Sequence, residues 1–375
     1  MNELDFRLGV PQRGYGITKN IPQQFLDESL RPSDYFRIKS ALNWRLRKKL
    51  NNRDLFRFHT PSFPRVDLLH FFNTVACTKT PWLVTFESLL PYFNSNIDDQ
   101  EKWLDHLLGD SCKGMIAMSN HSKVNFRWKL KELNKESLWG DFEKKMTLLP
   151  PPEKLKQQRQ NDEKLQFVFV AREFYKKGGH AVVRSLDYLR NHLGFDNWTA
   201  VLIGDLDSQP DDTVNSFEGI RAESLGLIEG LSGFIQHYTR LPHHEVVSVM
   251  QQSHYILHPT LQDTYGYVVI EAMSCGCVPI TCRIRAIEEI VDHGTSGFLL
   301  DVKTDENGNP KRFLSQTTWY NVESQLKNVL TTLITESAMD EYQCYAAAAR
   351  RRIELFHSPE VHSSELLKLY RRALQ

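Results

Sequence analysis

The stretch that decides the fold runs from His258 to Asp301 and reads HPTLQDTYGYVVIEAMSCGCVPITCRIRAIEEIVDHGTSGFLLD. The apolar run Tyr255 to Leu257 just before it predicts a buried strand, and Pro259 to Gly266 forms a polar turn. Apolar residues then recur at helical spacing over Val268 to Ser274, until a glycine and a proline end the helix. This order of strand, turn and helix is typical of one step in a parallel α/β sheet.

Polar groups in this unit are placed to bind a ligand above the turn. Asp263 lies in the turn and Glu271 lies about one and a half helical turns into the helix, so both carboxylates are expected to face one cleft. There they would accept hydrogen bonds from sugar or ribose hydroxyls. Because the helix is entered through Thr264, Tyr265 and Gly266, its first backbone N–H groups and positive dipole end suit a phosphate or sugar oxygen.

A second strand and helix surround two cations in FVFVAREFYKKGGHAVVRSL, residues 167–186. The run Phe167 to Val170 predicts a buried parallel strand, and Ala181 to Leu189 has the apolar period of a helix. Arg172 and Lys177 are therefore expected in a loop at the carboxyl end of a strand, where open α/β sheets bind their ligands. Two cations there would neutralise a diphosphate.

Both segments resemble the retaining glycosyltransferases of family four, also called glycosyltransferase group 1, which have the GT-B fold. That family has an acid, seven residues and a Glu, followed by Ala-Met-Ser/Ala-x-Gly-x-Pro, and here Asp263 to Gly276 follow that pattern, with two residues in place of one before Pro279. It also has Gly-Arg, four residues and Lys-Gly, which here reads Ala171, Arg172, four residues, Lys177 and Gly178. The resemblance implies two Rossmann-like domains facing a central cleft, with a C-terminal helix, from about Ser358 to Leu374, crossing back to the first domain.

The resemblance also implies the roles of individual residues. Arg172 and Lys177 would hold the donor diphosphate as it leaves, Asp263 would contact the donor hexose and Glu271 the ribose. Thr264, Tyr265, Gly266 and Tyr267 would complete the donor-binding turn. The family usually has Glu in place of Asp263 and Gly in place of Thr264, which leaves the identity of the donor sugar open.

The first half of the chain matches the family less closely. The stretch GVPQRGYG offers Gly16 as part of a glycine loop for a phosphate, although a plain surface turn explains it equally well. Glu87 ends the strand LVTFE where the family has a His, and it is either a site residue for a sugar or acceptor hydroxyl or a structural carboxylate. Ser119 opens a helix, where we expect it to serve as the N-cap.

The length and charge distribution of the chain predict two domains. The chain has 375 residues, more than one hydrophobic core usually serves, and Pro150 to Pro152 precede a polar run that is typical of a linker. We expect an acceptor-side domain at 1–150, completed by the helix 356–375, and a nucleotide-sugar domain at 151–355. Net charge is zero, but residues 1–150 hold 23 Lys and Arg against 17 Asp and Glu, a balance of +6, which leaves −6 for the rest.

Basic residues concentrate in the segment 37–58, RIKSALNWRLRKKLNNRDLFRF, which has leucines at helical spacing. Such a helix either lies on anionic lipid, where it would meet a lipid-linked acceptor, or packs on the core with a solvated basic face. Without an export signal or an apolar run of about 20 residues, we expect a cytoplasmic protein, peripheral at the inner face of the plasma membrane if this helix binds lipid. No motif indicates nucleic-acid binding.

No metal or other cofactor is expected. Asp205 and Asp207 spell Asp-x-Asp, but they follow a strand where the family has a turn, and His243 and His244 have no further ligand at suitable spacing. The six cysteines form no CxxC pair, so reduced thiols are expected.

These features together predict a metal-independent, retaining glycosyltransferase that moves a hexose from a nucleoside diphosphate sugar to a glycan or lipid-linked acceptor, in cell-surface glycan or polysaccharide biosynthesis. Two alternatives stay open at this point. One is a non-catalytic subunit that binds a nucleotide sugar or glycan, suggested by Glu87. The other is a sugar-nucleotide epimerase or a phosphorylase of the same fold.

Overall fold

The computed structural model describes residues 4–10, 19–22, 24–25, 58–59, 66–90, 97–159, 164–208, 217–310, 316–334 and 338–375. The chain divides into two compact units, one made of Met1–Pro152 with His357–Gln375 and the other of Glu153–Phe356. Each unit is built on its own parallel sheet. The basic segment 37–58 and Gly16 lie outside the described residues, apart from Phe58.

The first unit contains a five-stranded sheet of order β1-β3-β5-β6-β7. Its strands are β1 (Leu8–Gly9), β3 (Leu68–Phe72), β5 (Trp82–Phe86), β6 (Cys112–Ala117) and β7 (Met146–Leu148). A separate parallel pair joins β2 (Phe58–His59) to β4 (Ala76–Cys77). The central strands β3 and β5 are buried and mostly apolar, with His70 and Thr85 as their polar members, as expected when both faces of a parallel sheet are covered.

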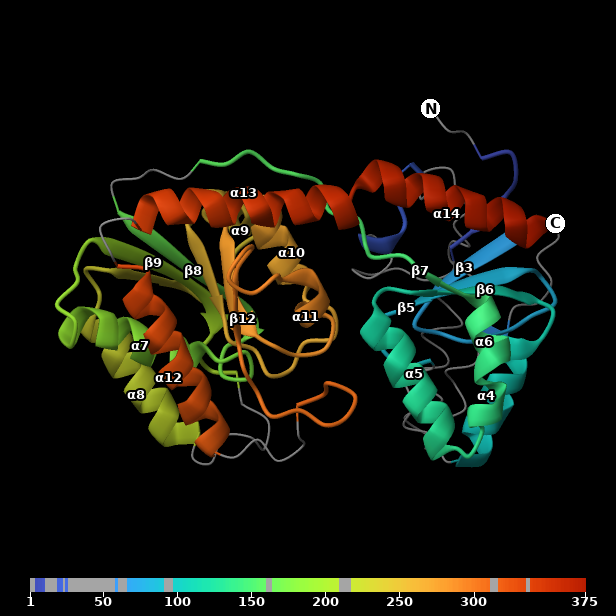
Figure 1. Cartoon of the computed structure of the whole chain (residues 1–375), viewed down its shortest axis with the longest axis horizontal. Helices are drawn as coiled ribbons and strands as arrows, with labels where there is room; N and C mark the ends of the chain where they lie inside the picture. The colour runs from blue at the N-terminus through green and yellow to red at the C-terminus, as the bar shows by residue number, and fades with distance from the viewer. Residues whose placement is uncertain are drawn as a thin grey trace. The chain divides into compact units, whose positions relative to one another are not determined.

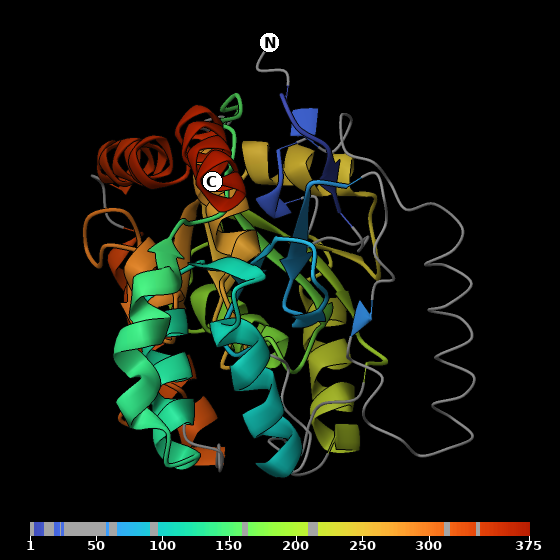
Figure 2. The same cartoon turned by 90° about the vertical axis from the view of Figure 1, so that its right-hand side faces the viewer.

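Helices cover the two faces of this sheet, as Figures 1 and 2 show. One face packs on α4 (Ile97–Leu108), α5 (Asn120–Glu132) and α6 (Trp139–Lys145), which follows the short 3₁₀ helix Glu136–Leu138. The other face packs on α14 (Pro359–Leu374), whose Leu366, Leu367 and Tyr370 join strand residues such as Leu83 and Ile116 in one buried cluster. Alternate residues of each strand thus face opposite helical layers. The prediction that the C-terminal helix returns to the first domain is confirmed.

The second unit contains a six-stranded sheet of order β10-β9-β8-β11-β12-β13. Its strands are β8 (Leu165–Glu173), β9 (Trp198–Asp205), β10 (Ile235–Tyr238), β11 (Tyr255–His258), β12 (Val278–Cys282) and β13 (Phe298–Leu300). The chain builds outward from β8 in one direction and then from β11 in the other. The order therefore reverses between β8 and β11, and ligands of such sheets bind at the carboxyl ends of the strands beside that reversal.

Helices also form two layers around this second sheet (Figure 1). One layer contains α7 (Gly179–Asn191), α8 (Phe217–Gly230) and α12 (Gln316–Thr332). The other contains α9 (His243–Gln252), α10 (Tyr267–Ser274) and α13 (Ala338–Phe356), with the short α11 (Ile287–Ile290) after β12. The predicted α/β class with two Rossmann-like sheets is confirmed. None of the described helices combines the length and the apolar composition needed to cross a membrane.

Candidate active site at the carboxyl ends of β8 and β11

The strands β8 and β11 place Lys177 and Asp263 next to each other, as their positions in the sheet require. Lys177 lies in the turn after β8, Asp263 lies in the turn after β11, and the Lys177 Nζ lies 2.9 Å from Asp263 Oδ2. The same ammonium donates to the Gln262 carbonyl. Both side chains are about four-fifths buried, with 20% of Lys177 and 18% of Asp263 exposed. The structure thus brings together two of the predicted site residues.

Two hydrogen bonds to Asp263 fix the turn in which it lies. Asp263 Oδ1 accepts from the Gly266 N–H at 3.0 Å, and its main-chain carbonyl accepts from Arg285 Nη1 at 3.1 Å. Gly266 has φ +99°, which favours glycine, and it is the N-cap of α10. We expected the Gly266 N–H to face a ligand, but here it serves the carboxylate of its own turn. The first N–H groups of a helix have no acceptor within the helix, and the Asp263 carboxylate supplies one for the Gly266 N–H.

Burial and charge act against each other at Asp263. Burial raises the pKa of its carboxyl, but His258 and then Lys177 lower it by more, so the pKa lies well below its usual range. Asp263 is therefore ionised at neutral pH and available as a hydrogen-bond acceptor. His258 itself is the last residue of β11, and its Nε2 lies 3.6 Å from Asp263 Oδ2.

Arg172 lies in the last part of β8, which extends to Glu173, and so is not in the loop where it was predicted. Its side chain is exposed, and within the described part of the chain it makes no hydrogen bond or ion pair. It is therefore a cation at the carboxyl end of β8 whose charge is not neutralised by a neighbour there. The rest of the turn up to Gly178, which has φ +86°, leads into α7.

Thr264, Tyr265 and Tyr267 form the remainder of the predicted donor turn. Tyr265 is 3% exposed, its ring centroid lies 5.5 Å from that of Tyr267, and burial raises the pKa of its hydroxyl. Thr264 and Tyr267 are half-buried. Tyr265 is therefore mainly part of the core below the turn.

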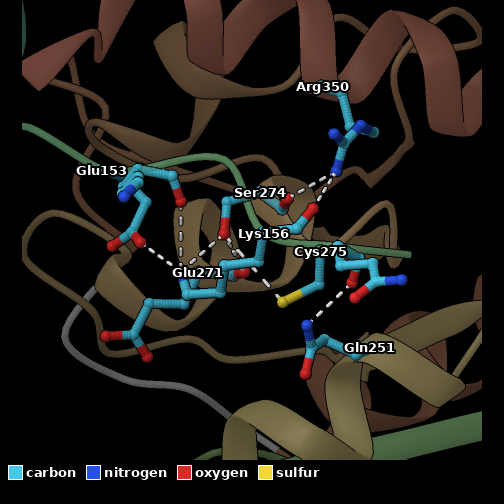
Figure 3. A network of polar contacts seen from close by, with 9 residues as sticks. Glu153, Lys156, Gln251, Glu271, Ser274, Cys275 and Arg350 are labelled. Atoms are coloured by element: carbon cyan, nitrogen blue, oxygen red, sulfur yellow. Dashed lines mark hydrogen bonds and ion pairs between the residues drawn. The ribbon is translucent and has the colours of Figure 1, made fainter. Parts of the chain in front are cut away.

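Glu271 lies in α10 and is 5% exposed. The end of its helix is fixed by the polar network of Figure 3. Lys156 Nζ donates to Ser274 Oγ at 2.8 Å and pairs with Glu153, while Arg350 Nη1 donates to the carbonyl oxygens of Lys156 and Ser274. Ser274 Oγ in turn donates to the Glu271 carbonyl at 2.7 Å. Lys156, in the segment that follows the first unit, and Arg350 of α13 thus hold α10, and with it Glu271, in place.

In the first unit, Glu87 directly follows β5. Its N–H donates to Asn73 Oδ1 at 3.0 Å, and its carbonyl accepts from Ser122 Oγ. Ser119 is the N-cap of α5, with its Oγ accepting from the Ser122 N–H at 3.1 Å, so the predicted cap is confirmed. Glu87 is consequently held through its backbone, at the carboxyl end of a central strand.

Of the other polar pairs considered from the sequence, Asp205, Asp207 and His244 have local partners. Asp207 pairs with Arg221 at 2.5 Å, and Asp205 Oδ1 accepts from the Asp207 N–H. His243 begins α9, and His244 lies 3.8 Å from Glu245. Among the described residues, no group of three or more His, Cys, Asp or Glu is placed to hold a metal ion.

Sequence reasoning missed two residues that contact Asp263. His258 carried a signal, since it directly follows the predicted strand Tyr255 to Leu257, on the side where ligands bind. Arg285, which has φ +45° and also donates to Asn309 Oδ1, lies 22 positions after Asp263, and no spacing rule links the two.

Comparison with known proteins shows which proteins this chain resembles in sequence and in fold. Residues 151–309 match the family described as Glycosyl transferases group 1. A segment of 49 residues is 37% identical to the phosphatidylinositol N-acetylglucosaminyltransferase gpi3 subunit of Schizosaccharomyces pombe, covering 13% of this chain and 11% of that protein. The chain thus spans about a tenth of that curated relative.

Solved structures match over nearly the whole chain at low identity. A glycosyltransferase from Rickettsia africae superposes with a TM-score of 0.59 at 14% identity, over 99% of this chain and 100% of the other. Anabaena HepE, solved in complex with UDP and glucose, gives 0.61 at 14% identity, over 97% and 98%. At this identity the likeness shows the fold. The chain therefore has the GT-B fold, and its residues 151–309 match the family of group 1 glycosyl transferases.

Proposed function

We propose that this protein is a retaining glycosyltransferase that moves a hexose from a nucleoside diphosphate sugar to an acceptor hydroxyl. The observation that supports this most directly is the contact of Lys177 with Asp263 at the reversal of strand order, inside the domain that matches group 1 glycosyl transferases. The site combines a cation for a diphosphate with an ionised carboxylate for sugar hydroxyls.

In the proposed reaction, the bond between the anomeric carbon and the diphosphate oxygen breaks as the acceptor oxygen bonds to the same face of that carbon. The acceptor proton passes to the departing diphosphate oxygen, and a nucleoside diphosphate leaves. Lys177 and Arg172 stabilise the charge that develops on the diphosphate, and preorganised charge of this kind is commonly the largest catalytic contribution. Asp263 holds the hexose and Glu271 the ribose.

The comparisons suggest the substrates to try first. HepE was solved with UDP and glucose, and the S. pombe relative is named for transfer of N-acetylglucosamine to phosphatidylinositol. We therefore propose a UDP-hexose donor and a glycan or lipid-linked acceptor at the cell surface, with no metal taking part.

The test is loss of donor from a panel of UDP, GDP and ADP sugars, with and without EDTA, followed by mass spectrometry. We expect the wild-type protein to consume one donor at a rate that EDTA does not change. Lys177→Ala should lower this rate by at least about 100-fold, because a charge-assisted contact to the leaving diphosphate is removed. Lys176→Ala is the matched control, since Lys176 is the adjacent lysine and pairs with Glu173.

Unchanged turnover in Lys177→Ala would contradict the assigned role of Lys177. Binding of a donor without any breakdown, even with glycan and lipid acceptors present, would contradict the enzyme itself. It would instead favour a non-catalytic subunit, and Glu87→Gln would then test whether Glu87 takes part in that binding.

A further inference from the structure

His258 is a buried histidine whose two ring nitrogens have no hydrogen-bond partner among the described residues. It is 1% exposed, ends β11, and lies with its ring centroid 6.4 Å from that of Phe169. Its Nε2 lies 3.6 Å from Asp263 Oδ2, just beyond hydrogen-bond distance. The ring therefore faces the carboxylate of the candidate site without yet bonding to it.

A second buried polar group beside His258 is also unpaired within the described part of the chain. Thr281 of β12 is the in-register neighbour of His258, so the two side chains leave the sheet on the same face. Thr281 is fully buried, and its Oγ1 has no partner there either. Leaving a buried polar group unpaired destabilises a protein, and such groups in native folds call for an explanation. The position of the His258 ring beside Asp263 points to a state of the site in which that ring is bonded.

The charge state of His258 determines what it can donate. Burial, and to a lesser extent Lys177, lower the pKa of its imidazole, while Asp263 acts in the opposite direction. At neutral pH the ring is therefore uncharged and carries one N–H. The favourable tautomer places that hydrogen on Nε2, which faces the Asp263 carboxylate, and leaves Nδ1 as the acceptor. Among the residues that the structure describes, the charged side chains that act on this ring are those of Asp263 and Lys177.

Donor binding would change which groups contact the two carboxylate oxygens of Asp263. In the present structure, Lys177 and the Gly266 N–H hold its two oxygens. A donor diphosphate attracts the Lys177 ammonium, which weakens the ion pair just when the carboxylate must stay ionised and oriented toward the sugar. Lys177 would release the Oδ2 oxygen of Asp263, and His258 Nε2 lies 3.6 Å from that same oxygen. A small shift would bring the His258 N–H within hydrogen-bond distance of it.

We propose that His258 is a positioning residue that takes over Asp263 from Lys177 when the donor binds, so that the carboxylate stays fixed against the hexose hydroxyls. This inference rests on the proposed function. It adds a residue that touches neither substrate nor leaving group, and whose loss affects recognition of the sugar but not of the nucleotide.

The first test compares His258→Phe with His258→Gln. His258→Phe removes the N–H and should lower kcat/KM for the donor about 10- to 100-fold, the effect of losing a hydrogen bond to a charged group. Binding of the free nucleoside diphosphate, which lacks the hexose, should change less than about twofold. His258→Gln keeps a donor group and should recover most of the kcat/KM.

His254→Phe is the matched control. His254 is equally buried in the same unit, directly precedes β11 at its other end, and accepts the Gln166 N–H on Nδ1. It should show the loss of stability that follows removal of a buried imidazole, with wild-type kcat/KM where the variant is folded. Wild-type kcat/KM in His258→Phe, or an equal fall in His254→Phe, would overturn the proposal.

A second test does not depend on turnover. In protein labelled with ¹⁵N-histidine, the His258 signal is identified by its loss in His258→Phe. We expect a neutral ring with its hydrogen on Nε2 between about pH 7 and pH 8, since the pKa lies below the usual histidine value. We also expect a changed shift of the His258 signal in Asp263→Asn. A hydrogen on Nδ1 would overturn the proposal even if a donor is turned over. If no donor is consumed while the Nε2 tautomer is found, the proposed function fails but the contact between His258 and Asp263 stands.

Discussion

Gly266 shows how one residue fixes the geometry of the candidate site. Its N–H donates to Asp263 Oδ1, and its φ of +99° lets the chain turn from Asp263 into α10. A Cβ at this position would lie 2.9 Å from Ile287 Cγ1, closer than real contacts allow. Backbone strain and a steric clash therefore both exclude other residues.

We expect Gly266→Ala to lower the free energy of unfolding of the second unit by about 1–3 kcal/mol, the usual cost of a non-glycine residue in such a conformation. Donor turnover should fall as well, because Asp263 is displaced with its turn. Denaturant unfolding and the donor assay measure the two effects.

Gly226→Ala provides the control for that substitution. Gly226 is exposed in α8, and a Cβ there would meet nothing within 4 Å. Alanine in a helix interior should raise stability by about 0.5–1 kcal/mol. Equal effects of the two substitutions would show that Gly266 is not under strain.

Some residues of the site were predictable from sequence and others were not. Lys177 and Asp263 follow strands whose apolar runs are unambiguous, and adjacent parallel strands must bring their carboxyl ends together. The bond from Gly266 to Asp263 was missed, because the path of a turn depends on packing against Ile287 far along the chain. Arg285 was missed for the same reason. The structure shows where these side chains lie, but the roles assigned to all the site residues, Lys177 and Asp263 included, stay predictions.

At the scale of elements, α14 is held on the first sheet by a buried polar chain as well as by apolar packing. The Tyr370 hydroxyl lies 2.7 Å from His70 Nδ1, and His70 Nε2 lies 2.8 Å from Thr85 Oγ1. These two hydrogen bonds thus join α14 to β3 and β5. Burial, with a smaller contribution from His362, lowers the pKa of His70 to about 3.

This predicts acid sensitivity of the first unit. Between about pH 6.5, the usual value for histidine, and pH 3, the unfolded chain binds a proton at His70 that the folded unit does not. Stability should therefore rise with pH through this window and be fully present above it. Between pH 7 and pH 5, His70 alone should account for a loss of about 2 kcal/mol.

Hydrogen exchange of α14 and β3 amides, corrected for intrinsic rates, measures this loss. His70→Gln should be less stable at pH 7 but should show a flatter dependence on pH. His192→Gln, an exposed position in the second unit, should leave the dependence unchanged. The same slope in His70→Gln as in the wild type would assign the acid sensitivity to another group.

For the whole molecule, the alternation of strands and helices in the sequence predicted an α/β fold with two sheets. It predicted the individual helices and strands of the first unit less well. The parallel sheet of β8 to β13 agrees with the predicted repetition of βα steps, although β10 (IQHY) is not an apolar run. In the first unit, α4, α6 and β7 were not predicted, because their short amphipathic segments resemble loops until they pack against β6. The return of α14 came from resemblance to the family, since local sequence gives no information on which sheet a terminal helix covers.

That return makes the first unit discontinuous, which predicts different behaviour for the two units on truncation. A chain of residues 153–356 keeps its six strands and their core, so it should fold by itself. A chain of residues 1–152 lacks α14, and so exposes the surface that Leu366, Leu367 and Tyr370 cover. Each large side chain contributes about 1.5–3 kcal/mol on burial. Three such losses approach the 5–15 kcal/mol that usually separates folded from unfolded domains.

We therefore expect 153–356 to unfold cooperatively with dispersed NMR signals, and 1–152 to be unfolded or aggregated. Joining 357–375 to 1–152 through a short Gly/Ser linker should restore the first unit, because the helix supplies the missing face of the sheet without the second unit. A chain of 1–152 that folds as stably as the joined form would show that α14 adds little to that core. The hydrogen bonds that link Tyr370, His70 and Thr85 would then serve only to orient α14 on the sheet. The sheet itself would stay folded without α14 and without these bonds.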